Sequence, residues 1–271
     1  MTPPALPLLA IWSILSGALA VADPESDNKA DQVKISYVAP SNTALQRIYE
    51  QMKKRRVLEA FQDYLRPLRL PGPLLIKTDD CNGDANASYE ESEHAITVCY
   101  EYIEELVRNA PDTTIPAGLT PEDAVTGPTI EVFLHEIGHA LFDMLKVPIL
   151  GREEDAADQF AAYLMLQLEP ERAWKTVAGV VYMYSLEALA RDPKLQEFAN
   201  VHGLPAQRLY NVMCLAYGAD PKLFGIVVDR GYLPAARAEG CLDEYKHVDY
   251  AFKQLIGPHF DPTQCRTRVD K

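Results

Sequence analysis

The sequence has few basic side chains for its length. It contains 26 Lys and Arg against 39 Asp and Glu among 271 residues, and its formal net charge is −13. Nucleic acids and anionic membrane surfaces are bound by clustered Lys and Arg. The one dense basic run, Lys53 to Arg56, falls inside a predicted helix and is interpreted as a solvated helix face. Nucleic acid is therefore not expected as a partner.

The sequence also lacks a hydrophobic run long enough to cross a bilayer, which takes about 20 apolar residues. The N-terminal apolar segment carries Pro7 and ends in small residues, with Ala20 and Ala22 each closing an A-x-A pattern. Such a segment is typical of a cleaved secretory signal peptide, although no Lys or Arg precedes its apolar part. We expect a signal peptide over residues 1–22 and an exported mature chain, periplasmic or secreted, that does not insert into the membrane. An uncleaved N-terminal anchor is the alternative.

Cysteine occurs only five times, at Cys81, Cys99, Cys214, Cys241 and Cys265. In an exported protein this number suggests two disulfides and one remaining thiol. Cys81 and Cys99 bracket a predicted hairpin whose ends must meet, and Cys214 and Cys241 each lie in a predicted C-terminal helix. The pairs Cys81–Cys99 and Cys214–Cys241 are therefore favoured, with Cys265 unpaired. Spacing alone does not fix the connectivity, so Cys265 could replace a partner in either pair.

Gly and Pro residues divide the chain into an N-terminal α+β part and a C-terminal helical part. The predicted elements are, in order, a polar tether (23–42), a helix (43–65), two short β-branched runs (74–78 and from 95), a helix (100–109) and a loop (109–127). Everything after Pro128 reads as helical. The expected fold is α+β and mostly helical, a single domain over 43–271 with an α+β part (43–127) and a helical part (128–271).

One segment of the helical part, HEIGHALFDMLKVPILGREEDAAD at residues 135–158, carries a dense group of metal-binding side chains. His135 and His139 are four residues apart, so they share one helix face and can direct two imidazole nitrogens at one point. Apolar residues nearly surround this helix and indicate that it is buried, where unpaired polar groups are costly. A metal ion would satisfy both histidines and Glu136. Chance alone gives H-E-x-x-H in only about one in a hundred chains of this length.

The next predicted helix supplies candidates for a third ligand. Glu154 and Asp158 are four residues apart on one face, and the small neighbours Ala157 and Ala161 allow the two helices to approach closely. Glu154 is the favoured third ligand, and Asp158 is expected to fix the tautomer of a ligand histidine. Glu153 is the competing ligand. Acidic residues in a first turn also suit the helix dipole, which gives them a second explanation.

The H-E-x-x-H motif followed by E-x-x-A-D on the next helix resembles the motif of the gluzincin metallopeptidases. This resemblance implies one zinc ion held by His135, His139 and Glu154, with Glu136 as general base and Asp158 behind a ligand histidine. The mature chain also resembles a bacterial family of candidate metallopeptidases that is classed as a domain of unknown function. That likeness rests on the stretches CNGDANASY, ITVCYE, HEIGHALFD, EEDAADQFA, QRLYNVMCLAYGADP and LPAARAEGCLDEY. It implies a zincin-like fold in which the small N-terminal sheet packs on the H-E-x-x-H helix.

These residues predict a zinc-dependent metallopeptidase that acts on a peptide or protein substrate. A zinc-activated water would attack the scissile bond, with Glu136 taking its proton. The oxyanion needs a further donor. His202 is the first candidate because it lies at a helix-breaking Gly-Leu-Pro turn, and loops often carry functional residues. The other candidates are Tyr163, Tyr210 and Arg237.

Two alternatives stay open. A deformylase-like zinc amidohydrolase pairs H-E-x-x-H with a cysteine from an E-G-C-L sequence, which this chain has at residues 239–242. Here Cys241 follows the helix, whereas the deformylase cysteine precedes it, and Glu154 and Asp158 would have no explanation. The second alternative is a non-catalytic secreted protein with a structural zinc, a kind of site that a fourth protein ligand usually closes. The sequence offers no fourth ligand near the motif.

Overall fold

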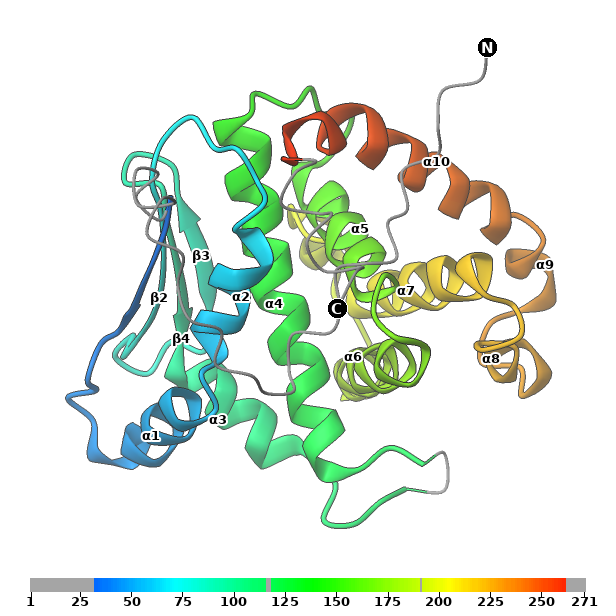
Figure 1. Ribbon diagram of the computed structural model, residues 1–271. Coiled ribbons are helices and arrows are strands. Elements are labelled where there is room, and N and C mark those ends of the chain that lie inside the picture. The colour runs from blue at the N-terminus through cyan, green and yellow to red at the C-terminus, as the bar shows by residue number, and fades with distance from the viewer. Residues whose placement is uncertain (1–31, 116–117, 191, 262–271) are drawn as a thin grey trace.

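The computed structural model describes residues 32–115, 118–190 and 192–261. The predicted signal peptide (1–22) and Cys265 lie outside these ranges. Within them the chain forms helices and one four-stranded sheet, so the fold is α+β and mostly helical, as predicted (Figure 1). No helix in the described ranges is long and apolar enough to cross a membrane.

The sheet has the strand order β1-β2-β4-β3. Its strands are β1 (Val33–Tyr37), β2 (Leu74–Asp79), β3 (Ala87–Glu90) and β4 (Ala95–Cys99). The first three in this order run parallel, with Ile35, Ile76 and Ile96 in register, and β3 pairs antiparallel with β4. Alternate residues of β2 are buried, which fits a strand that turns one face to the core.

β1 corrects one prediction from the sequence. Residues 33–37 fall within the predicted polar tether (23–42), yet they form an edge strand of the sheet. The strand is short and lies among polar neighbours, and its partner β2 is distant along the chain. Pairing with β2, rather than local sequence preference, therefore determines its conformation.

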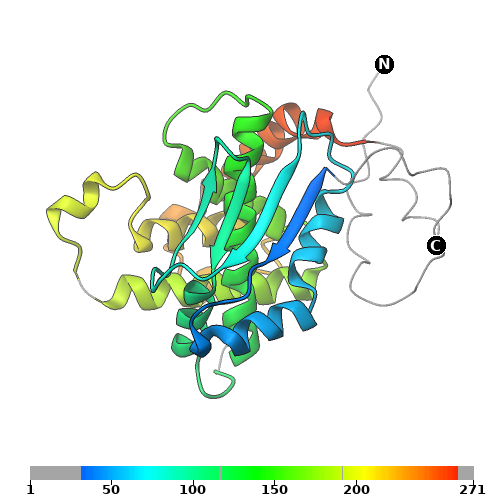
Figure 2. The ribbon, with the colours of Figure 1, turned by 90° about the vertical axis from the view of Figure 1, so that its left-hand side faces the viewer.

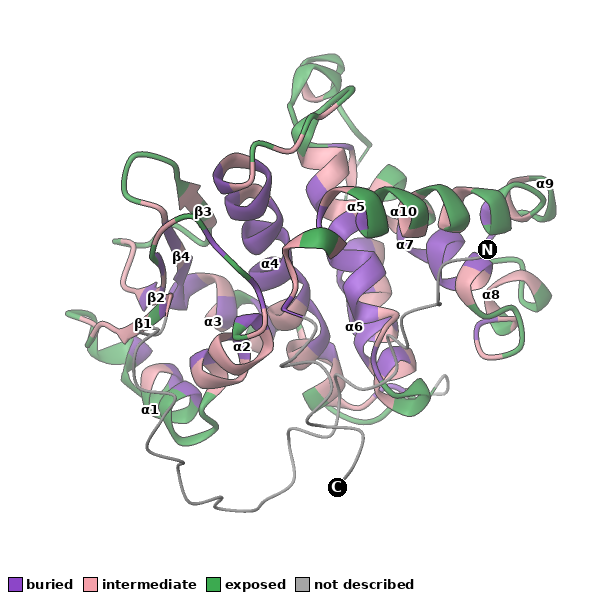
Figure 3. Ribbon diagram, turned by 45° about the horizontal axis from the view of Figure 1, so that its top comes forward, coloured by how far each residue is buried: buried purple, intermediate pink, exposed green. Residues whose placement is uncertain are grey.

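α4 (Pro121–Met144) runs through the centre of the molecule. It contacts β3 and β4 on one side, and α5 (Glu153–Met165) and α6 (Pro170–Ala190) on the other. Figure 1 shows the sheet and these helices on opposite sides of α4, and Figure 2 shows the sheet face-on in front of α4. The helix is consequently buried along most of its length (Figure 3). The sheet thus packs on the helix that carries the two histidines.

The remaining helices cover these layers. They are α1 (Gln46–Lys54), α2 (Val57–Leu65), α3 (Tyr100–Asn109), α7 (Pro205–Ala219), α8 (Ile226–Asp229), α9 (Ala235–Ala238) and α10 (Cys241–Leu255), with short 3-10 helices at Thr43–Leu45, Leu195–Ala199 and Gly257–His259. The helix predicted over 43–65 is therefore interrupted. Arg56 adopts a left-handed conformation (φ 54°) between α1 and α2, which a helix interior does not tolerate.

α4 also begins earlier than the sequence suggested, because residues 121–127 of the predicted loop are helical. Thr120 and Asp123 form a reciprocal capping box, and Pro121 occupies the first turn, where its missing N–H costs nothing. Pro128 then lies inside the helix. Gly127 and Gly179 allow α4 and α6 to touch here, since a Cβ atom on Gly179 would overlap the carbonyl oxygen of Asp123.

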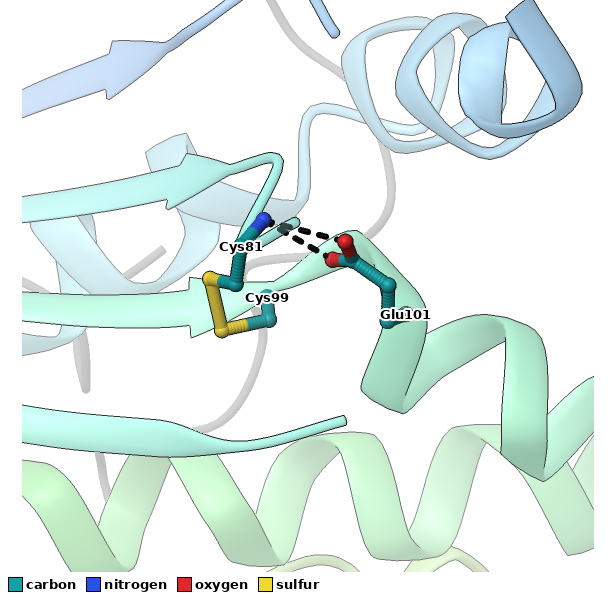
Figure 4. Close-up of side chains that lie close together, drawn as sticks. All are labelled: Cys81, Cys99 and Glu101. Carbon is teal, nitrogen blue, oxygen red and sulfur yellow. Dashed lines mark hydrogen bonds between the residues drawn. A yellow bond between two sulfur atoms is a disulfide. The ribbon is translucent and has the colours of Figure 1, made fainter. Parts of the chain in front are cut away.

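Two disulfides join elements that are distant in sequence, in the pairs that the sequence favours. Cys81–Cys99 closes the segment that contains the β3–β4 hairpin, with 5.5 Å between the Cα atoms. Figure 4 shows Glu101 beside this bridge, where its carboxylate accepts hydrogen bonds from the backbone N–H of Cys81. The same carboxylate accepts a hydrogen bond of 2.8 Å from the backbone N–H of Gly83. Cys214–Cys241 joins α7 to α10, with 5.0 Å between the Cα atoms.

The tight α4–α6 contact yields a prediction about stability. Gly179→Ala should lower the free energy of unfolding by about 1–3 kcal/mol, because the new methyl group must displace the backbone of α4. Urea unfolding followed by circular dichroism measures the loss. Gly72→Ala is the matched control, since its Cβ atom would have nothing within 4 Å. Equal stability of the two variants would contradict the packing described for this contact.

Candidate metal centre

The candidate centre lies where α4 crosses α5. At the crossing a Cβ atom on Gly138 would come within 3.1 Å of Phe160 Cδ1 and 3.4 Å of Ala157 Cα, so the two helices are in close contact. Ala157 and Ala161 are fully buried beneath it. The small residues that the sequence places on α5 therefore do permit the close approach that was expected of them. One helical turn on either side of this contact brings the polar side chains of the two helices together.

Three predicted ligand side chains converge at this crossing. His135 Nε2 lies 3.1 Å from Glu154 Oε2, and His139 Nε2 lies 3.3 Å from the same oxygen. The two Nε2 atoms are 3.1 Å apart. His135 and Glu136 are buried, with 4% and 6% of their surfaces exposed, so this group sits at the edge of the core.

His202 reaches the same point from the segment between α6 and α7. Its Nε2 atom is 2.8 Å from Glu154 Oε2, and its ring stacks on that of His135 with 6.0 Å between centroids. Its side chain is 44% exposed, against 6% for His135, so it forms the solvent side of the cluster. Of the other oxyanion candidates, Tyr163 donates to Asp249 and Arg237 pairs with Glu244.

Glu153 and Glu154, the two candidates for the third ligand, contact different nitrogen atoms of the histidines. Glu153 contacts Nδ1 of His139 at 2.7 Å, which is the ring nitrogen that faces away from the shared point. Glu154 instead meets Nε2 of His135, His139 and His202. Glu154 therefore faces the point that the three Nε2 atoms share, and Glu153 contacts His139 on the opposite side of its ring.

This donor set fits a zinc ion. Zinc bonds of about 2.0–2.1 Å to four tetrahedral ligands place neighbouring ligand atoms about 3.3–3.4 Å apart. The Nε2 and Oε2 atoms of His135, His139 and Glu154 are separated by 3.1–3.3 Å, close to that spacing. Imidazole nitrogens and a carboxylate oxygen are also ligands that zinc prefers.

The electrostatics of the cluster favour a cation. Hydrogen bonds with His135, His139 and His202 hold the pKa of Glu154 far below its usual range, so its carboxylate is ionised. Burial lowers the pKa of His135, but hydrogen bonds with Asp158 and Glu154 outweigh burial and raise the pKa to about 10. The site thus stabilises positive charge, which a metal ion supplies when it displaces the proton. Burial raises the pKa of Glu136, which has no hydrogen-bond or ion-pair partner among the described residues.

A buried network behind His135 was not anticipated from the sequence. Asp158 Oδ1 lies 2.9 Å from His135 Nδ1, as expected, but the same carboxylate also accepts two hydrogen bonds from Arg208 of α7. Arg208 further approaches Glu131, which accepts a hydrogen bond of 2.8 Å from Tyr184. Arg208 falls within the stretch QRLYNVMCLAYGADP that carries the family resemblance, and this is the signal that could have indicated it.

Two other groups of potential ligands do not fit a metal. Glu131, His135 and Asp158 offer ligand atoms within 4.8 Å of one another, but the guanidinium of Arg208 already binds both carboxylates. Cys81, Cys99 and Glu101 also offer ligand atoms within 4.8 Å of one another. The two cysteines form a disulfide, however, so their sulfurs cannot act as thiolate ligands.

Two cavities lie near the centre without containing its histidines. A mostly apolar cavity of about 470 Å³ borders another face of α4, where Ile130 and Leu134 line it. A smaller hollow of about 330 Å³ lies beside the first turn of α5 and the start of α7. It is lined by Arg152, Asp155, Gln207, Tyr210, Asn211, Pro234 and Arg237.

Comparison with known proteins agrees with this geometry. Residues 37–256 match a family described as "Putative metallopeptidase". No curated protein matches the chain, and no solved structure does. The match spans most of the sequence and includes both α4 and α5. The chain therefore belongs to this metallopeptidase family.

Proposed function

We propose that the protein is a zinc-dependent metallopeptidase that hydrolyses peptide bonds in a peptide or protein substrate. The observation that carries the proposal is the convergence of His135 Nε2, His139 Nε2 and Glu154 Oε2 within 3.3 Å of one another. Three protein ligands with an open fourth position are the usual composition of a catalytic zinc site. When bound, zinc would supply Lewis acidity to a water molecule and to the scissile carbonyl.

In this proposal Glu136 is the general base. It lies between the two histidines on α4, is buried, and has a pKa raised by that burial. A carboxylate with a raised pKa is a stronger base, and it can take a proton from water and return it to the leaving nitrogen. His202 Nε2 is the group proposed to donate to the oxyanion, because it lies on the exposed side of the cluster, which a substrate could reach.

The two disulfides support an exported location for the protein and bear on the deformylase-like alternative. Two disulfides are typical of an oxidising compartment, which supports the export that the N-terminal sequence suggests. Cys241 is bound to Cys214, so it has no thiolate to offer a metal. The deformylase-like reading, which needs that ligand, therefore loses its support.

One observation favours a second candidate function. Glu154 Oε2 lies within 2.8 Å of His202 Nε2, so His202 could close the site as a fourth ligand. A zinc ion with four protein ligands is usually structural, and the protein would then bind zinc without catalysis.

Metal analysis of the purified mature protein tests the ligand set. The wild type should contain close to one zinc per chain, and Glu154→Ala should lose most of it because an ionised ligand is removed. Glu153→Ala is the comparison on the neighbouring residue and should retain more zinc than Glu154→Ala, because it removes only a contact to Nδ1 of His139. If Glu153→Ala releases the metal and Glu154→Ala retains it, the assignment of the two carboxylates is reversed. A wild type without bound metal would reject the site as a whole.

Glu136→Gln separates catalysis from binding. The side chain keeps its shape but can no longer take a proton, so hydrolysis should fall by about 100-fold or more with zinc content unchanged. Cleavage of a peptide library, read by mass spectrometry, measures the rate. Glu122→Gln, on the exposed start of the same helix, should have no effect. Full cleavage by Glu136→Gln would mean that the activity arises elsewhere.

His202→Ala distinguishes the two candidate functions. As an oxyanion donor, His202 can be removed with a loss of about 100-fold or more in kcat while zinc stays bound. As a fourth ligand, its removal should weaken zinc binding, which competition with a fluorescent chelator measures. A wild type that cleaves no peptide, combined with zinc loss in His202→Ala, would establish the closed structural site.

A further inference from the structure

Arg208 of α7 holds the carboxylate of Asp158 by two hydrogen bonds. Its Nε donates to Oδ2 at 2.7 Å and its Nη2 donates to Oδ1 at 2.5 Å. A guanidinium bound to both carboxylate oxygens fixes the rotation of the carboxylate as well as its position. This matters because Oδ1 is also the atom that faces His135 Nδ1, at 2.9 Å.

Two further residues, Tyr184 and Glu131, contact Arg208. Its guanidinium carbon lies 4.6 Å from the centre of the Tyr184 ring, and its Nη2 lies 3.4 Å from Glu131 Oε1. Tyr184 in turn donates to that oxygen at 2.8 Å. The side chains of Arg208, Asp158 and Glu131 are only 19%, 12% and 4% exposed. An arginine in such surroundings has little freedom to move.

We propose that Arg208 is a positioning residue for the metal centre, and that it acts on His135 through Asp158. The two hydrogen bonds from Arg208 hold Asp158 so that its Oδ1 accepts a hydrogen bond from the N–H at His135 Nδ1. This leaves the lone pair on Nε2 directed at the point shared with His139 and Glu154. The inference rests on the proposed metal site, but it concerns a residue of α7 that is not itself a ligand.

Holding both carboxylate oxygens of Asp158 requires an arginine at position 208. A lysine carries the same charge on a single nitrogen, so it cannot hold both oxygens in one plane. Asp158 without its arginine would be a buried carboxylate with one remaining partner, free to turn away from His135. A change at Arg208 should therefore alter how the metal is held even though Arg208 does not touch it.

A double-mutant cycle on zinc affinity tests this coupling. Zinc dissociation constants are measured by chelator competition for wild type, Asp158→Asn, Arg208→Met and the double variant. Each single change should weaken zinc binding by about 10- to 100-fold. The double variant should bind no more weakly than Asp158→Asn alone, because Arg208 is proposed to act on His135 only through the Asp158 carboxylate, which that change removes. Losses that multiply in the double variant would overturn the proposal, since Arg208 would then act independently of Asp158.

Arg152→Met is the matched control. Arg152 also binds a carboxylate of α5 through two nitrogens, at 2.9 Å each to Asp155, but this pair is exposed and does not contact a histidine. Its zinc affinity should stay within about twofold of wild type, as expected for an exposed pair. Equal affinities for Arg208→Met and Arg152→Met would refute the inference while leaving the metal site intact. A wild type that binds no zinc would remove the site and the inference together.

The Arg208→Lys variant and its cobalt spectrum distinguish a change at the metal centre from a general loss of folding. Loaded with Co²⁺, the lysine variant should show a shifted or weakened visible absorption band, because the His135 ligand is held differently. Thermal melting of the metal-free proteins reports the effect on the fold separately. A lysine variant with the wild-type cobalt spectrum and wild-type zinc affinity would contradict the requirement for the arginine fork.

Discussion

Gly138 lies where α4 and α5 touch, and it has no side chain to separate them. With Ala157 opposite, it lets the helices approach until Phe160 Cδ1 is 3.1 Å from the position of a Cβ atom. The histidines of α4 and the carboxylates of α5 are placed within one turn of this contact on both helices. A Cβ atom at Gly138 would require Phe160 to shift by a few tenths of an ångström, and metal sites tolerate only about 0.2 Å in their bond lengths.

The same burial that fixes the centre imposes a cost that the fold must offset. α4 is enclosed by the sheet and by α5 and α6, yet it carries Glu131, His135 and Glu136 on buried positions. Unpaired charges there would cost several kcal/mol each. The structure compensates two of them with partners from other helices, whereas burial raises the pKa of Glu136 and so makes its carboxylate a stronger base. The candidate base is thus the member of the set that is left without a fixed partner.

The spacing of residues along the sequence predicted those features that lie within one helix or one hairpin. The i, i+4 pairs His135/His139 and Glu154/Asp158 each lie on one helix face, and the disulfide around the β3–β4 hairpin follows from its closed ends. Two features that depend on distant partners were missed. Strand β1 exists because β2 lies beside it, and Arg208 meets Asp158 only because α7 returns to α5. No spacing within a single helix encodes such a contact, and so neither could be predicted from periodicity.

The members of the cluster also differ in the elements that carry them and in their exposure. Three of its side chains project from the long helices α4 and α5, whose backbones are fixed by packing. His202 comes from the segment between α6 and α7, and its side chain is 44% exposed. Residues that must hold a metal benefit from a rigid scaffold, whereas residues that contact substrate lie more often on loops. The exposed position of His202 between two helices is that of the second kind, which agrees with its proposed role as an oxyanion donor.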